Sequence, residues 1–308
     1  MLLHTAVENF FNAKIGILKT STIRWYRLRL KSLTDMYGER DIGDITPEDL
    51  DRWRAAIATR DTRYTDHPYR HELNDRGLTP RTLHGYVRAV RTFFNFCMRR
   101  HYVERNPSFD LAYPRLPKEP PKHITDADID RLLKAARSLR DYTIVLILAD
   151  TGCRVGGLAS LTRDQIDLET GTLYLKEKFD KLNVYYLNEQ PLTYLKKLIA
   201  ETPPAKHNAV FLNQNTGEPL KTTGFNQVLK RLAEIAGVKG RCNPHSFRHH
   251  KARELLDNGL SLEAGAELLN HENIQTIASF YGRWTPEELR EKHRGHSRKT
   301  YPDLNIEH

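Results

Sequence analysis

The feature that most constrains the fold of this chain is a proline-rich segment in its interior. Residues 106–122, NPSFDLAYPRLPKEPPK, contain five prolines. Each proline lacks the amide hydrogen that a helix needs, and it biases the residue before it toward an extended conformation. A chain of 308 residues is long for one domain. The segment therefore predicts a linker between two domains.

The residues before the linker predict a helical domain. Apolar side chains recur at helical spacing over residues 20–36, and Thr46-Pro47 and Thr79-Pro80 each place a capping residue and a proline at a helix start. Residues 60–77 are polar and irregular, which favours a surface loop. The expected inward positions are Ile23, Tyr26, Leu30, Leu33, Met36, Leu50, Trp53, Ile57, Leu83, Tyr86, Val90, Phe93 and Cys97.

The residues after the linker predict a mainly helical domain with a small antiparallel β-sheet. Thr125 begins a capping-box sequence, and an apolar helix over 142–149 ends at Gly152. Two short strands, 172–176 and 183–187, are joined by a turn around Phe179. Further helices are expected near Pro191 and over 224–236, 244–258, 261–269 and 273–281. The expected inward positions are Ile129, Leu132, Leu133, Ala136, Phe225, Val228, Leu229, Leu232 and Ile235.

The charge balance favours a polyanionic partner. Lys and Arg total 48 against 39 acids, a net charge of +9, which suits nucleic acid or an anionic membrane. The most apolar run, residues 144–149, is far shorter than the ~18–20 residues that cross a bilayer, and no secretory signal is visible. Three scattered cysteines fit a reducing cytosol rather than a disulfide framework. We therefore expect a cytoplasmic, DNA-associated protein without a membrane partner.

Basic residues are concentrated on two of the expected helices. Residues 81–105 hold six arginines and one acid, Glu104. An ordinary solvated helix face usually mixes charges of both signs, so contact with phosphates explains this bias better. Each phosphate contact steepens the salt dependence of binding by roughly 0.9 log units per log unit of salt. The candidate DNA-binding residues are Arg24, Arg27, Lys31, Arg81, Arg88, Arg91 and Arg99.

Several polar residues of the second domain could together cleave a phosphodiester without a metal. Taken singly, each has an ordinary structural explanation, such as a solvated lysine, a histidine that caps a helix or a buried tyrosine. Together they supply guanidinium forks that bind phosphate oxygens, a phenol that can act as nucleophile and an amine that can protonate the leaving oxygen. These candidate catalytic residues are Arg154, Lys178, His245, Arg248, His271 and Tyr281.

The spacing of these residues resembles that of the phage integrase family of tyrosine recombinases. The His-x-x-Arg motif stands here as His245 to Arg248, and Arg154 follows Thr-Gly as in that family. The family's nucleophile lies nine or ten residues after a Leu-Gly-His motif. Here that motif is Leu269-Asn270-His271, and the count selects Tyr281 because Phe280 cannot act as a nucleophile.

Other positions match this family less closely. Lys178 fits best as the lysine of the hairpin turn, with Lys181 and Lys176 as alternatives. Gly157 stands where family members commonly carry an acid that supports the site, and Asn270 replaces the usual glycine.

The resemblance implies both a domain organisation and a mechanism. It implies a helical, SAM-like core-binding domain over 1–105, the linker over 106–122, a catalytic domain over 123–285 and a charged tail over 286–308. Tyr281 would attack the scissile phosphate to give a 3′-phosphotyrosyl bond and a free 5′-hydroxyl. Arg154 and Arg248 would bind the oxygens of the phosphate. His245 and His271 would position the phosphate and handle the tyrosine proton, and Lys178 would act as general acid toward the 5′-oxygen. No metal, other cofactor or ATP is implied.

The same resemblance implies partners. These are double-stranded DNA recombination sites, further copies of the chain in a homotetramer on synapsed DNA, and accessory directionality or DNA-bending proteins. Residues 286–308 could pack onto a neighbouring subunit or form a frayed tail.

Three alternatives remain open at the level of sequence. A metal-dependent nuclease could use His245 and His249, four residues apart and next to His250, although no carboxylate-rich ligand set accompanies them. A DNA-binding protein could have kept the fold and lost the chemistry, for which Gly157 leaves room. A topoisomerase or resolvase could share the chemistry without exchanging partners. The sequence does not separate integration, excision, transposition, inversion and dimer resolution.

Overall fold

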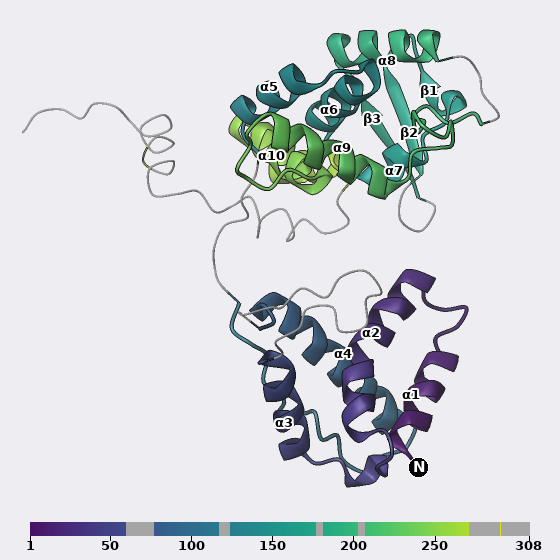
Figure 1. The fold of residues 1–308 in the computed structure, drawn as a ribbon, viewed down its shortest axis with the longest axis vertical. Helices are drawn as coiled ribbons and strands as arrows, with labels where there is room; N and C mark the ends of the chain where they lie inside the picture. Colours follow the sequence, from purple (N-terminus) through teal and green to yellow (C-terminus); the bar gives the residue numbers. More distant parts are fainter. Residues whose placement is uncertain (60–76, 117–123, 177–180, 203–206, 271–289, 291–308) are drawn as a thin grey trace, which may run out of the picture. The chain divides into compact units, whose positions relative to one another are not determined.

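The computed structural model of the chain describes residues 1–59, 77–116, 124–176, 181–202, 207–270 and 290. The chain divides into two compact units, Met1–Glu119 and Pro120–His308 (Figure 1). Both are mainly helical, and the second holds a small antiparallel sheet, which confirms the predicted fold class. Among the described residues, no helix combines the length and the apolarity that a membrane crossing requires.

The first unit is built from four α-helices and one short 3-10 helix in its described part. Thr46 and Asp49 form a capping box, and the Thr79 hydroxyl accepts from the amide of Thr82, so two of the helices begin where the sequence predicts. The helices are α1 (Leu3–Asn12), α2 (Thr20–Tyr37), η1 (Ile42–Asp44), α3 (Pro47–Ala58) and α4 (Pro80–Arg99).

Aromatic rings join the helices of this unit. The Phe10 ring of α1 meets Phe93 and Phe96 of α4 edge-on, with centroids 5.8 and 5.3 Å apart. Trp53 of α3 is fully buried, and its indole nitrogen donates to the Ser32 hydroxyl of α2 at 3.1 Å. Helix α1 was not predicted from the sequence, and its first turn has no side-chain cap.

The structure corrects the predicted start of the linker. Leu111 is buried in the core of the first unit, and its carbonyl accepts from Arg91 at 3.0 Å. The carbonyl of Ala112 accepts from Arg54 at 3.0 Å. Proline stops the helix but does not prevent the residues between prolines from packing, so the beginning of the segment belongs to the first unit. Residues 117–123 of the predicted linker and 60–76 of the predicted loop lie outside the described residues.

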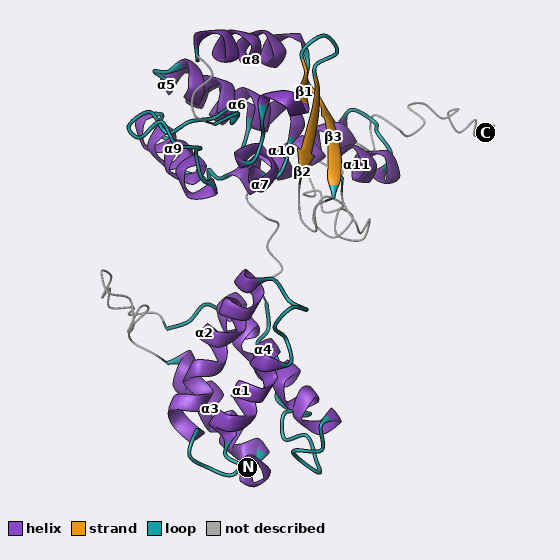
Figure 2. Cartoon of the chain, turned by 90° about the vertical axis from the view of Figure 1, so that its right-hand side faces the viewer, coloured by secondary structure: helices purple, strands orange, loops and turns teal. Residues whose placement is uncertain are grey.

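The second unit places a three-stranded sheet beside its helices (Figure 2). The strand order is β1-β2-β3, and all neighbours are antiparallel. Tyr174 lies opposite Val184, and Lys176 opposite Leu182. The elements are α5 (Asp126–Ala135), α6 (Leu139–Thr151), α7 (Val155–Ala159), η2 (Arg163–Gln165), β1 (Ile166–Asp167), β2 (Thr172–Lys176), β3 (Leu182–Tyr186), α8 (Glu189–Glu201), α9 (Thr222–Ile235), α10 (Pro244–Asp257) and α11 (Leu262–Leu268).

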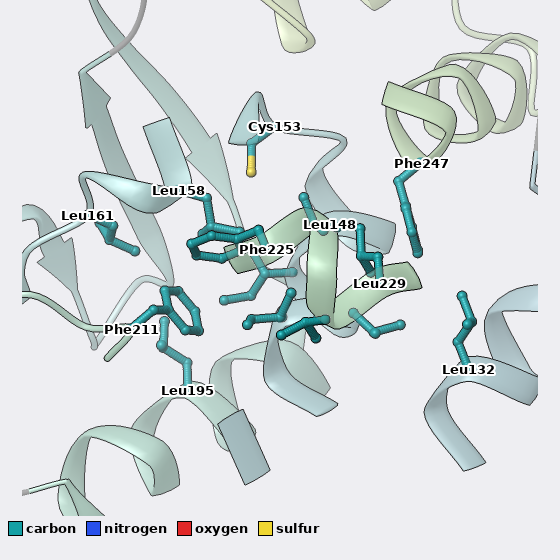
Figure 3. Packing of buried hydrophobic residues seen from close by; sticks show 14 of the residues in the cluster. Leu132, Leu148, Cys153, Leu158, Leu161, Leu195, Phe211, Phe225, Leu229 and Phe247 are labelled. Atoms are coloured by element: carbon teal, nitrogen blue, oxygen red, sulfur yellow. The ribbon is translucent and has the colours of Figure 1, made fainter. Parts of the chain in front are cut away.

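The core of the second unit fixes the helix that carries the predicted His-x-x-Arg motif. Helix α6 lies at the centre, with Leu148 fully buried, and Phe225 and Leu229 of α9 pack into the same cluster (Figure 3). Phe247 of α10 is also fully buried there. Burial of such a side chain contributes about 1.5–3 kcal/mol, so α10 is anchored to the core between His245 and Arg248.

Two predicted core positions are exposed instead. Met36 is 45% exposed and Ile235 is 58% exposed. Each stands in the last turn of its helix, and in α2 the buried stripe of Leu30 and Leu33 continues to Tyr37 instead of Met36. The helix predicted over 273–281 lies outside the described residues.

Candidate active site

Arg154, the arginine of the Thr-Gly-x-Arg sequence, comes shortly after Gly152, where helix α6 ends close to helix α10. Gly152 ends α6 in the left-handed region, with φ of 58°. A Cβ at Gly152 would lie 3.0 Å from the Cβ of Lys251 and 3.2 Å from Cδ2 of Leu269. Glycine is therefore required both for the backbone turn and for the approach of α10. Arg154 comes two residues later, at the start of α7.

The His-x-x-Arg motif occupies the first turns of α10. Asn243 caps this helix: its side chain accepts from the amide of Ser246 at 3.0 Å, and the Asn243 amide donates to the Ser246 hydroxyl. Proline follows at the first helical position, where its missing amide hydrogen costs nothing. This local sequence fixes where α10 begins and therefore which way His245 and Arg248 project.

Arg248 is a buried cation held by backbone carbonyls. Its side chain is only 2% exposed. Nη1 donates to the Gly152 carbonyl at 2.9 Å, and Nη2 donates to the Leu269 carbonyl. Burial of a charge is costly unless hydrogen bonds compensate for the lost water. These bonds also fix the plane of the guanidinium group.

Arg154 donates to the same turn. Its Nη2 donates to the carbonyl of Asn270 at 3.1 Å, across 116 positions of sequence. Consecutive carbonyls, those of Leu269 and Asn270, thus accept from the two arginines. Folding has brought both predicted guanidinium groups to Leu269 and Asn270, the first two residues of the predicted Leu-Gly-His-like motif.

Asn270 has a conformation that explains the glycine usual at this position in the family. Its φ is 52°, in the left-handed region that glycine adopts freely and asparagine tolerates better than most residues. Its side chain adds a bond that glycine cannot make, because Nδ2 donates to the Val184 carbonyl of β3 at 3.2 Å. This bond joins the turn to the strand that follows the predicted hairpin turn.

His245 has an environment suited to a neutral imidazole. Its ring lies 4.6 Å from the His249 ring, nearly perpendicular to it. The pKa of His245 is lowered from 6.5, chiefly because neighbouring protein removes water from the ring even though the side chain as a whole reaches solvent. The positive charges of Arg248, Arg154 and Arg241 lower this pKa further. A neutral imidazole can accept a proton near pH 7.

Three of the six candidate catalytic residues, Lys178, His271 and Tyr281, lie outside the described residues. Of the alternative lysines, Lys176 ends β2 and Lys181 directly precedes β3, and both are exposed. Gly157 is buried within α7. The described ranges contain no group of three His, Cys, Asp or Glu side chains that could hold a metal ion.

The seven candidate DNA-binding residues all lie on α2 and α4 of the first unit. Several of them already make contacts within the protein. Arg27 lies over the Phe11 ring at 4.6 Å and Arg88 over the Trp25 ring at 4.7 Å, while Lys31 pairs with Asp35 at 2.8 Å. Arg91 bonds to Leu111 and lies over the Tyr113 ring. The other three candidate DNA-binding residues, Arg24, Arg81 and Arg99, are exposed.

Sequence reasoning missed the backbone partners of the arginines. The carbonyls of Gly152, Leu269 and Asn270 accept from Arg154 and Arg248. No side-chain pattern marks a carbonyl as a ligand. A usable signal was the Thr-Gly pair directly after a buried helix, which predicts a left-handed turn and room for a neighbouring helix.

The fold and this arrangement define a class of protein, and comparison with known proteins identifies it. Residues 122–288, more than half of the chain, match the phage integrase family. The chain belongs to this family, and its activity is that of a tyrosine recombinase, the site-specific cleavage and rejoining of DNA.

Individual relatives agree with this assignment. The chain is 32% identical over 211 residues to tyrosine recombinase XerD of Listeria monocytogenes, covering 65% of this chain and 71% of the relative. It is 30% identical over 258 residues to tyrosine recombinase XerC of Bacillus pumilus, covering 80% and 83%.

Solved structures share the fold. The Tn1549 transposon integrase in complex with transposon right end DNA matches with a TM-score of 0.77 at 19% identity, covering 96% of this chain and 99% of that one. A lambda integrase dimer bound to a COC′ core site matches with a TM-score of 0.71 at 15% identity, covering 100% and 81%.

Proposed function

We propose that this recombinase breaks DNA by attack of Tyr281 on a phosphate held by Arg154 and Arg248. The observation that carries the proposal is the convergence of both guanidinium groups on the Leu269–Asn270 turn. Guanidinium donors lie in one plane and match the oxygens of a phosphate, and they stabilise the charge that gathers on pentacoordinate phosphorus. The end of this turn leads directly to His271 in the sequence.

The proposed cleavage step conserves the number of phosphoester bonds. The phenol oxygen of Tyr281 forms a bond to phosphorus, and the bond from phosphorus to the 5′-oxygen breaks. The phenol proton passes to His245 or His271, and Lys178 donates a proton to the leaving 5′-oxygen. Each positioned proton transfer is worth typically ~10²–10⁴ in rate. Because the 3′-phosphotyrosyl bond replaces a phosphodiester, a 5′-hydroxyl from a partner duplex can reverse the step without ATP.

The two units suit separate roles within this reaction. We assign the catalytic residues to the part that begins near residue 123 and extends to 285, and a DNA-backbone contact to the helices before the linker. The basic residues of α2 and α4 support that contact. We further propose that a homotetramer synapses pairs of recombination sites, with residues 286–308 packed onto a neighbouring subunit. It places the chain with the cellular DNA and leaves a role for accessory directionality or DNA-bending proteins.

A nicked suicide substrate tests the nucleophile. Cleavage beside a nick releases a short fragment, so rejoining is prevented and the covalent adduct accumulates. Wild type and the Tyr186→Phe control, which removes an exposed phenol of β3, should trap adduct at equal rates. Tyr281→Phe should trap none. Adduct formation by Tyr281→Phe at the wild-type rate would refute the assignment. Sequencing the junctions formed on intact sites then reveals whether partners are exchanged.

A further inference from the structure

The first unit stacks two guanidinium groups on a single indole ring. Arg29 lies one helical turn after Trp25 on α2, and its Cζ is 3.9 Å from the centroid of the Trp25 ring. Arg88 of α4 reaches the same ring, with its Cζ 4.7 Å from the centroid. A bond from Arg29 Nη1 to the Trp25 carbonyl, 3.2 Å long, holds the first guanidinium in place.

Helix α4 is shaped to admit Arg29. A Cβ at Gly85 would lie 3.0 Å from Arg29 Nε and 3.6 Å from the Trp25 ring, so the absence of a side chain there makes room for the stack. The next residue, Tyr86, places its ring centroid 5.6 Å from the Arg29 Cζ. Aromatic rings attract cations through their negative faces.

Carboxylates do not neutralise this cluster in the part of the chain that the structure describes. Other arginines of the unit pair with acids, as Arg52 does with Asp49 at 2.7 Å, whereas no ion pair is formed by Arg29 or Arg88 among the described residues. Arg29 Nε is buried and has no hydrogen-bond acceptor there. The pKa of Arg29 is lowered by burial and by repulsion from Arg88, with the Tyr86 hydroxyl opposing the shift. Two neighbouring cations held without an acid favour the binding of an anion.

We propose that Trp25, Arg29 and Arg88 form a binding site for a backbone phosphate of DNA, in which the indole positions both guanidinium groups. A guanidinium over a ring uses its face in that contact, so the N–H groups that the protein does not already use remain in the plane of the group and can donate to an anion. In the proposed site both groups donate to oxygens of the same phosphate. The proposal rests on the DNA-cleaving function inferred above, and it adds Trp25 and Arg29 to the residues that recognise the substrate.

The test measures binding of a fluorescent duplex to the full chain at several NaCl concentrations. All proteins carry Tyr281→Phe so that no adduct forms. Arg88→Gln should lower the slope of log affinity against log salt by about 0.9 for one lost phosphate contact. Trp25→Leu keeps every charge but removes the platform, and we expect its affinity to fall about tenfold or more. Trp25→Phe, which keeps a ring, should recover part of that loss.

Two further variants separate position from charge. Arg29→Lys keeps the charge and loses the planar group, so its affinity should fall while folding is retained. Lys197→Gln removes one charge from an exposed residue of α8 that faces Glu201, and it should leave affinity and slope close to wild type. If Trp25→Leu does not fold, the exposed Arg88→Gln variant still decides the outcome.

The outcomes distinguish this inference from the proposed function. Wild-type affinity and slope in Arg88→Gln and Arg29→Lys would overturn the phosphate site, whatever the nucleophile does. Adduct formation is measured separately, in proteins that retain Tyr281 and at saturating DNA. There the Lys197→Gln control should trap as much adduct as wild type. Absence of adduct in wild type would instead refute the proposed function and leave the binding result intact.

Discussion

Arg154 and Arg248 each depend on a backbone carbonyl of the Leu269–Asn270 turn, so the conformation of that turn decides where two positive charges lie. Within this turn, Asn270 has a positive φ. Asn270 tolerates this φ and also ties the turn to β3 through its amide. Motif spacing predicts the two arginines as site residues, but it does not reveal this support, because the acceptors are backbone atoms and Val184 is remote in sequence.

Replacement of Asn270 by glycine isolates the amide bond. Glycine accepts a φ of 52° without strain, so Asn270→Gly should fold and bind DNA normally. The lost bond to Val184 is worth about 1 kcal/mol, and we expect single-turnover adduct formation to slow about two- to tenfold. Asn270→Asp keeps the size but sets a carboxylate against the Val184 carbonyl, so it should be at least as slow. A wild-type rate in both variants would contradict this role.

The protonation of His245 gives a second prediction. Its pKa is lowered from 6.5 by desolvation and by nearby guanidinium groups. The NMR titration midpoint of the free protein should therefore lie below 6.5, and Arg154→Gln should move it partway back. An unfolded chain binds this proton more readily, so the stability that the neutral ring contributes is present above pH 6.5 and declines as pH falls toward the folded midpoint. A midpoint above 6.5 in wild type would refute this environment.

The helix starts show which local sequence signals are enough to predict a helix. Thr46 and Thr125 begin α3 and α5 with capping boxes, and both starts follow from short-range chemistry that the sequence displays directly. Helix α1 lacks such a cap and was missed, although it buries Phe10. Strand β1 is two residues long and carries no readable alternation. Elements held mainly by tertiary contacts are therefore the ones that sequence patterns did not predict.

Gly152 allows a prediction about how α6 and α10 meet. Gly152→Ala would combine a left-handed φ with a Cβ only 3.0 Å from that of Lys251. We expect a loss of about 1–3 kcal/mol in the free energy of unfolding, measured by urea titration. Adduct formation should fall with it, because the Gly152 carbonyl also holds Arg248. Gly156→Ala is the matched control: nothing lies within 4 Å of its added Cβ, and α7 should tolerate it. Equal stability of the two variants would contradict the close approach.

For the whole molecule, the sequence predicted two mainly helical parts and a small antiparallel sheet. These predictions were possible because the prolines that interrupt helices and the helical spacing of apolar residues can be read along the chain. It placed the beginning of the linker too early, since the burial of Leu111 depends on Arg91 and on the core of the first unit. The excess of basic residues and the motifs predicted the kind of substrate. They could not predict that Trp25 and two arginines form one cluster, because that requires α2 and α4 to be packed together.

Metal removal separates the proposed chemistry from a metal-dependent nuclease. Guanidinium, imidazole and amine groups supply the charge stabilisation and proton transfers in the proposed step, so EDTA should leave the rate of adduct formation unchanged. A nuclease that used His245 and His249 as metal ligands would lose activity in EDTA and recover it with added metal. Such a loss and recovery would favour the nuclease.

In the proposed reaction Tyr281 becomes covalently joined to DNA at a phosphate bound by Arg154 and Arg248. The most direct measurement is mass spectrometry of the peptide that remains on nicked DNA after protease digestion. We expect a nucleotide adduct on Tyr281, joined through the 3′-phosphate of the cleaved strand, and no adduct when Arg154 is replaced by Gln. An adduct on any other residue, or one joined through a 5′-phosphate, would contradict it.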